Sequence, residues 1–141
     1  VIRHSIKPCL VAPLASQPVK KILAGYDGSG HASRALHEAI EIAVALSVPL
    51  VILVVAEEGQ EEAARGHAED AMKLARAHEC VAANLVVTGN PEEQIRAKAH
   101  DLSCNLIVVG AYGHGRIREF ILGSTTHQLI ARSVLPVMLV R

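Results

Sequence analysis

The sequence predicts a doubly wound α/β domain, in which helices cover both faces of a parallel sheet. Half of the 141 residues are apolar and only 2% are aromatic, a composition that suits helices packed on strands buried on both faces. Short apolar runs, typical of buried strands, alternate along the chain with longer segments whose apolar residues recur at helical spacing. Ligands of such sheets bind at the carboxyl ends of the strands, where the strand order reverses.

Five strands and four helices are expected in order. The strands are predicted at 20–26, 50–56, 81–88, 106–110 and 136–140, and the helices at 31–47, 61–79, 91–102 and 123–133. The sharpest helix start is Asn90-Pro91-Glu92-Glu93, because Asn90 can cap, Pro91 suits the first helical position and Glu93 can reach back to the cap.

An internal repeat changes the interpretation of the N-terminal segment. Residues 1–11 align without gaps with 129–139, and Ile, Ser and Pro coincide. We expect residues 1–18 to be the tail of a preceding similar domain plus a linker, and 19–141 to be the domain itself; chance similarity is the alternative. The segment 7–12 is then predicted to pair antiparallel with 136–140, within the chain or swapped into a second copy.

Composition excludes several classes of function. The fourteen basic and fourteen acidic residues balance, so no overall field favours nucleic acid. Cys9, Cys80 and Cys104 lack a C-x-x-C spacing and are interpreted as reduced thiols of a cytoplasmic protein. The eight histidines form no H-E-x-x-H motif, so no metal site is expected.

No apolar run approaches the ~20 residues of a membrane span, and Pro8 and Pro13 interrupt the one stretch that resembles a signal peptide.

The strongest functional signal is a glycine motif after the fourth predicted strand. Gly110-Ala111-Tyr112-Gly113 is followed, after nine residues, by Gly123-Ser124-Thr125 at the start of a helix. Glycines let backbone N–H groups approach an anion, and a helix N-terminus favours phosphate. A helix cap built from Thr125 and Gln128 is the alternative, although capping alone would require neither Gly110 nor Gly113.

A second signal is Tyr26-Asp27-Gly28-Ser29, at the carboxyl end of the first strand. Asp-Gly is turn chemistry and Ser29 can cap the next helix. Alternatively, the Asp27 carboxylate accepts hydrogen bonds from a base or a sugar. The residues alone do not decide between these interpretations.

Two other nucleotide motifs are near misses. The spacing from Gly25 to Gly30 is that of a P-loop, but His31 and Ala32 replace the Lys and Ser/Thr that bind phosphate and Mg²⁺. A dinucleotide fingerprint over 28–33 would place the Asp27 carboxylate beside a pyrophosphate, which is repulsive.

The glycine motif and Asp-Gly-Ser together resemble the ATP-binding branch of the universal stress protein family, over about residues 19–141. The resemblance implies a fold like that of the adenine nucleotide alpha hydrolases, with strand order 3-2-1-4-5 and here an extra N-terminal strand. It also implies that Asp27 and the Val55 backbone hold adenine. The other implied nucleotide-binding residues are Tyr26, Val109, Gly110, Gly113, Gly123, Ser124 and Thr125. Two departures are Ala111, where Ser or Thr is common, and a short segment after the second strand.

The resemblance also sets the expected ligand and partners. The ligand would be ATP or AMP, with Mg²⁺ in the case of ATP. Family members dimerise through their last strands and often occur as tandem pairs, which implies a homo-oligomer or an intramolecular pseudo-dimer here.

No catalytic apparatus is recognisable in the sequence. His114 and Arg116 lie in the glycine loop and are candidates for phosphate contacts, but His114 has no orienting partner nearby in sequence. A nucleotide-binding regulatory domain is therefore the leading hypothesis, with at most slow incidental ATP hydrolysis. The alternatives are a structural dimerisation module with an empty site and a weak ATP-hydrolysing or adenylyl-transfer enzyme.

Overall fold

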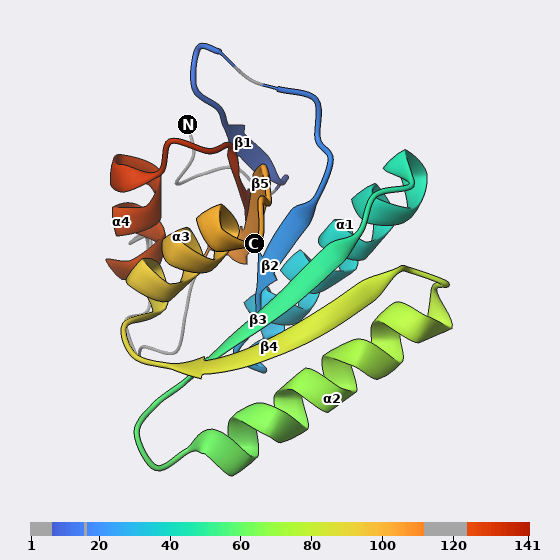
Figure 1. Ribbon diagram of the computed structural model, residues 1–141, viewed down its shortest axis with the longest axis vertical. Helices are drawn as coiled ribbons and strands as arrows, with labels where there is room; N and C mark the ends of the chain where they lie inside the picture. The colour runs from blue at the N-terminus through green and yellow to red at the C-terminus, as the bar shows by residue number, and fades with distance from the viewer. Residues whose placement is uncertain (1–6, 16, 112–123) are drawn as a thin grey trace.

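The computed structural model of the chain describes residues 7–15, 17–111 and 124–141 (Figure 1). The strands are β1 (Cys9–Val11), β2 (Ile22–Gly25), β3 (Leu50–Ala56), β4 (Ala82–Thr88), β5 (Leu106–Gly110) and β6 (Val137–Val140). The helices are α1 (Gly30–Leu46), α2 (Glu61–Ala77), α3 (Pro91–Asp101) and α4 (Ser124–Arg132). Strands and helices alternate as predicted, with boundaries shifted by a few residues.

The described strands form one sheet in the order β1-β6-β5-β2-β3-β4. From β4 to β6 this is the predicted order 3-2-1-4-5, and these five strands pair in parallel. β1 adds to the outer side of β6 in antiparallel orientation, with Cys9 opposite Leu139 and Val11 opposite Val137. The predicted N-terminal strand is therefore confirmed, and it pairs within the chain.

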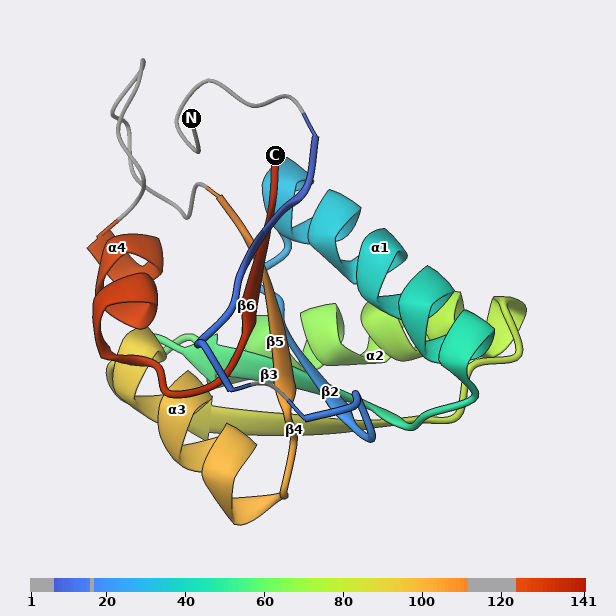
Figure 2. The same cartoon turned by 90° about the horizontal axis from the view of Figure 1, so that it is seen from above.

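The sheet is buried on both faces because its strands are continuous apolar runs. Alternate residues point to opposite sides: Ala24, Ile52 and Val108 pack under α1 and α2, whereas Leu23, Leu53 and Ile107 pack with residues of α3 and α4. Figure 2 shows the two pairs of helices on either side of the sheet. This is the doubly wound architecture that the sequence predicts.

Local sequence signals explain where the helices begin. Ser29 caps α1 by accepting a hydrogen bond from the Ala32 N–H, and Asn90 caps α3 by accepting one from the Glu93 N–H. The buried residues of α1 recur every three or four positions, from Ala32 and Ala35 to Ala43, which is the apolar stripe of an amphipathic helix. None of the helices in the described ranges is long and apolar enough to cross a membrane.

Candidate functional site

At the carboxyl edge of the sheet, the order of the strands reverses between β2 and β5. These strands are parallel neighbours, with Ile22 opposite Leu106 and Ala24 opposite Val108, but β3 and β4 follow on one side and β6 on the other. A doubly wound sheet binds ligands at such a point. Gly25 and Gly110 end the two strands, so the candidate site lies above two glycines.

On the α1 side of this edge, Gly110 packs directly against the first turn of α1. A Cβ at Gly110 would lie 2.8 Å from the carbonyl carbon of His31 and 2.9 Å from the backbone nitrogen of Ala32. This position therefore requires glycine for the packing of β5 on α1. A structural role therefore suffices to explain a glycine here, and the predicted role of Gly110 in nucleotide binding stays a prediction.

Tyr26 and Gly28 also lie against helices on this side. The Tyr26 ring packs on the clusters under α1 and α2 and meets the His67 imidazole of α2 edge to face, with centroids 6.2 Å apart. Gly28 has a φ of +80°, and a Cβ there would be 2.5 Å from the His67 ring. The Tyr26 side chain therefore lies on the α1/α2 side of the sheet, and its predicted role in nucleotide binding stays a prediction.

Asp27 performs the turn role that the sequence allowed. Its Oδ1 accepts a hydrogen bond from the Ser29 N–H at 2.9 Å, and the Ser29 hydroxyl in turn accepts one from the Ala32 N–H at 3.1 Å. The carboxylate is half-buried at the end of β2. The hypothesis that Asp27 also binds a base or a sugar stays a prediction.

On the α3/α4 side, apolar residues line the sheet below its edge. A Cβ at Gly25 would be 3.1 Å from Val109 and 3.3 Å from Ile95, and Val55 packs on the same cluster. Val55 and Val109, both predicted site residues, therefore share this face. Sequence analysis did not identify Gly25 and Ile95 as residues of the site. A usable signal existed for Gly25, because it lies near the end of a predicted strand, next to the turn predicted to bind a ligand.

One turn before Ile95, Glu92 is a buried carboxylate. Its side chain is 1% exposed, pairs with Arg96 through Oε1 and lies 3.9 Å from Arg132 of α4 through Oε2. Oε2 has no hydrogen-bond partner. Sequence analysis placed Glu92 only within the start of this helix, because burial between two helices has no local signal.

The start of α4 is tied to the end of β5 through Thr126. This residue is 3% exposed, and its hydroxyl donates to the Gly110 carbonyl at 3.2 Å. Because α4 begins at Ser124, Thr125 is its second residue and not an N-cap. Gly113, His114, Arg116 and Gly123, as well as the Ser124 side chain, lie outside what the structure describes.

Cationic groups gather on the α1 side beside β6. Arg34 Nε donates to the Arg141 carbonyl at 2.7 Å, and its Nη2 lies 2.8 Å from His31 Nδ1. Burial lowers the pKa of His31 below 6.5, Arg34 and Arg141 lower it further, and Asp27 opposes them. The imidazole is therefore neutral and accepts the hydrogen bond from Arg34, since a guanidinium only donates. The described residues contain no cluster of His, Cys, Asp and Glu that could hold a metal.

Comparison with known proteins identifies the family. Residues 18–141 match the Universal stress protein family. The chain belongs to this family. The universal stress protein Slr1230 of Synechocystis sp. is 34% identical over 142 residues, which are 100% of this chain and 49% of that protein. The chain thus spans about half the length of this relative.

Solved structures of universal stress proteins share the fold. One from Archaeoglobus fulgidus superposes with a TM-score of 0.79 at 26% identity, over 99% of this chain and 51% of its own. A universal stress protein solved in complex with cAMP superposes with a TM-score of 0.76 at 27% identity, over 87% of this chain and 97% of its own. Both likenesses cover most of this chain.

Proposed function

We propose that this universal stress protein domain binds an adenine nucleotide, ATP or AMP, as a regulatory module of a cytoplasmic stress response. The observation that carries the proposal is the 27% identical relative solved with cAMP, which aligns over 87% of this chain. The glycine motif after β5 and the reversal point between β2 and β5 are the chain's own features that agree with it.

The packing supports a ligand on the α3/α4 side of the sheet edge. On the α1 side, Gly110 is already in contact with the helix backbone, whereas the buried Val109 and the half-buried Val55 make the other side apolar. In this proposal adenine rests near Asp27 and Val55, and the phosphates reach the N-terminus of α4. Ser124, Thr125 and the glycines before them would donate hydrogen bonds there, with Mg²⁺ accompanying ATP.

We propose binding without efficient catalysis. His31, whose backbone lies against Gly110 at the end of β5, accepts a hydrogen bond from Arg34 and has a lowered pKa. Burial and two arginines lower its pKa more than the Asp27 carboxylate raises it, which makes it a weaker proton acceptor. Slow incidental hydrolysis is compatible with this arrangement.

We further propose that residues 1–12 are the tail of a preceding similar domain. The repeat with 129–139 and the antiparallel pairing of β1 with β6 support this. So does the Archaeoglobus structure, which matches 99% of this chain with 51% of its own length. The pairing would be the intramolecular counterpart of a dimer through last strands.

The decisive experiment is to denature the purified protein and identify any released nucleotide by mass spectrometry, followed by calorimetric titration with ATP, AMP and cAMP. We expect adenine nucleotides to bind, and GTP, the control, to bind much more weakly. Absence of released nucleotide together with flat titrations would favour a structural pairing module. Multiple turnovers of ATP with Mg²⁺ would favour an enzyme.

A further inference from the structure

The two outer strands of the five-stranded parallel part of the sheet, β6 and β4, differ in whether a further strand covers their outer edge. β6 is covered by β1, whereas β4 ends the strand order with no described strand beyond it. The Leu50 N–H donates to the Val81 carbonyl at 2.9 Å, and Leu50 lies opposite Ala82. Since alternate residues of a parallel strand bond to the neighbouring strand, the backbone groups of Asn84, Val86 and Thr88 point away from β3.

β4 lacks the usual protection of an exposed edge. Edge strands are commonly shielded by prolines, charged side chains or short length, but β4 has seven residues, Ala-Ala-Asn-Leu-Val-Val-Thr, without a proline or a charge. Val81, just before it, is 75% exposed. This edge can therefore accept another strand.

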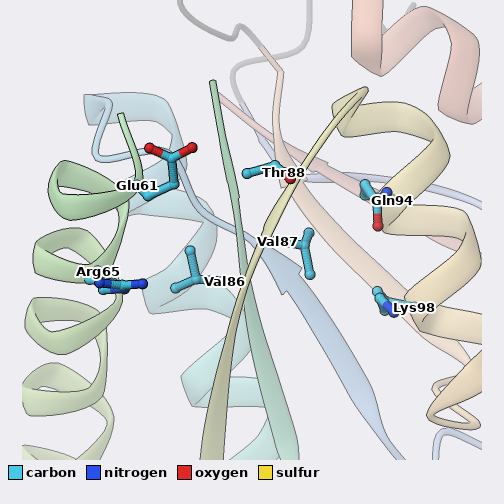
Figure 3. Close-up of a pocket in the computed structure, with 7 residues that line it drawn as sticks. All are labelled: Glu61, Arg65, Val86, Val87, Thr88, Gln94 and Lys98. Atoms are coloured by element: carbon cyan, nitrogen blue, oxygen red, sulfur yellow. The ribbon is translucent and has the colours of Figure 1, made fainter. Parts of the chain in front are cut away.

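The helices on either side turn the edge into a groove of about 500 Å³ (Figure 3). Its lining residues are Glu61, Arg65, Val86, Val87, Thr88, Gln94 and Lys98. Figure 3 shows Val86 directed toward Arg65 of α2, and Val87 directed toward α3 with Lys98. The groove thus has an apolar floor with one cation on each flank.

Neither Arg65 nor Lys98 forms an ion pair with another residue that lines the groove. Arg65 forms no ion pair with any described residue, and Lys98 lies 3.8 Å from the Asp101 carboxylate, a weak surface pair. The acidic member of the groove, Glu61, accepts a hydrogen bond from the Gly59 N–H at 3.3 Å at the start of its own helix. The groove therefore favours an acidic occupant.

We propose that this groove binds an extended acidic segment of a partner protein, which adds to β4 as a seventh strand. Neighbouring residues of a strand point to opposite faces, so two consecutive acidic residues would reach Arg65 and Lys98 simultaneously. A second copy pairing through its own β4 would bring no carboxylate to them, because β4 carries none. The proposal goes beyond nucleotide binding and does not depend on it.

The test uses a fluorescent peptide with blocked ends, Thr-Val-Glu-Glu-Val-Thr, and its Lys-Lys counterpart, with affinity measured by anisotropy. We expect the full chain to bind the acidic peptide, and R65E and K98E each to weaken it about tenfold, since each replaces attraction with repulsion. The double variant should prefer the Lys-Lys peptide. K73E, an exposed change on α2 outside the groove, should bind like the parent. Amide exchange should slow at Asn84, Val86 and Thr88 when the acidic peptide binds.

Three results would overturn the proposal. They are no binding of the acidic peptide, equal binding by the parent and the double variant, and binding without protection of the β4 amides. Sedimentation of the unliganded chain tests whether a second copy occupies the groove instead. A dimer whose β4 amides are already protected would assign the edge to that second copy.

Discussion

The two faces of the sheet differ most at its carboxyl edge. On the α1 face, Gly110 lies against the helix backbone, His67 covers Gly28, and the arginines near His31 bond within the chain. On the α3/α4 face lie Val55 and Val109, the buried Glu92 carboxylate with an unsatisfied oxygen, and the N-terminus of α4. The same glycine-rich edge thus packs against a helix on one face and, in our proposal, binds the nucleotide on the other.

The largest expected effect tests the binding face. Replacing Gly113 or Gly123 by Val should weaken ATP at least about 100-fold, or ~2.7 kcal/mol, because a side chain would stand where backbone N–H groups and phosphate must meet. Calorimetric titration measures this. Gly66→Val is the matched control, since nothing lies within 4 Å of a Cβ there. If the folded Gly113 and Gly123 variants bind ATP as tightly as the parent does, the glycine motif is not part of the site.

The next effect tests the packed face. Gly110→Ala should lower the free energy of unfolding by about 2–3 kcal/mol, since its methyl group would overlap the α1 backbone. Urea unfolding measures the change. Gly30→Ala, where a Cβ meets nothing within 4 Å, should change stability by under about 1 kcal/mol. Equal stabilities of the two variants would show that β5 does not rest on α1 in this way.

The sequence predicted what depends on local pattern. The order of strands and helices followed from apolar periodicity, the Asn90 cap from its neighbours, and the β1–β6 pairing from the repeat around Pro8 and Pro136. The periodicity and the cap lie within short windows of sequence, and the repeat is a direct match between two short segments at opposite ends of the chain. That is why they could be interpreted without a structure.

What the sequence could not supply depends on the distance between elements far apart in the chain. The contact of Gly110 with α1, the hydrogen bond from Thr126 to Gly110 and the burial of Glu92 all arise from how helices dock on the sheet. The direction in which a side chain points could not be predicted from the sequence either. Tyr26 and Asp27 are adjacent, yet the packing of β2 turns the Tyr26 ring toward α1 and α2.

A smaller effect is expected at Asp27, between the two faces. Asp27→Ala should weaken ATP and AMP equally, by about 1–3 kcal/mol if the carboxylate binds the base or sugar. Ser29→Ala removes the neighbouring cap, so it should cost about 1 kcal/mol of stability and leave affinity unchanged. Calorimetry and urea unfolding on both variants separate the two roles. An Asp27 variant that loses only stability would limit this residue to its turn.

The smallest effect is a pH dependence from His31 on the packed face. Burial and the two arginines hold its pKa below 6.5 in the folded chain, against the opposing effect of Asp27. Below pH 6.5 the unfolded chain therefore binds more protons than the folded chain. The contribution of His31 to the free energy of unfolding is complete above that pH and declines as the pH falls. His31→Asn retains an acceptor for Arg34 without titrating. The stability advantage of the parent over this variant should shrink between pH 7.5 and pH 5.5.

The same variant locates the ligand relative to the two faces. A phosphate chain on the α1 face would approach His31 and raise its pKa, because a nearby anion favours the imidazolium. ATP would then bind the parent more tightly at pH 5.5 than at pH 7.5, relative to His31→Asn. With the ligand on the α3/α4 face, the ratio of the two affinities should stay constant across this range. We expect a constant ratio in calorimetric titrations at both pH values, and a ratio that rises at acid pH would place the phosphates on the α1 face.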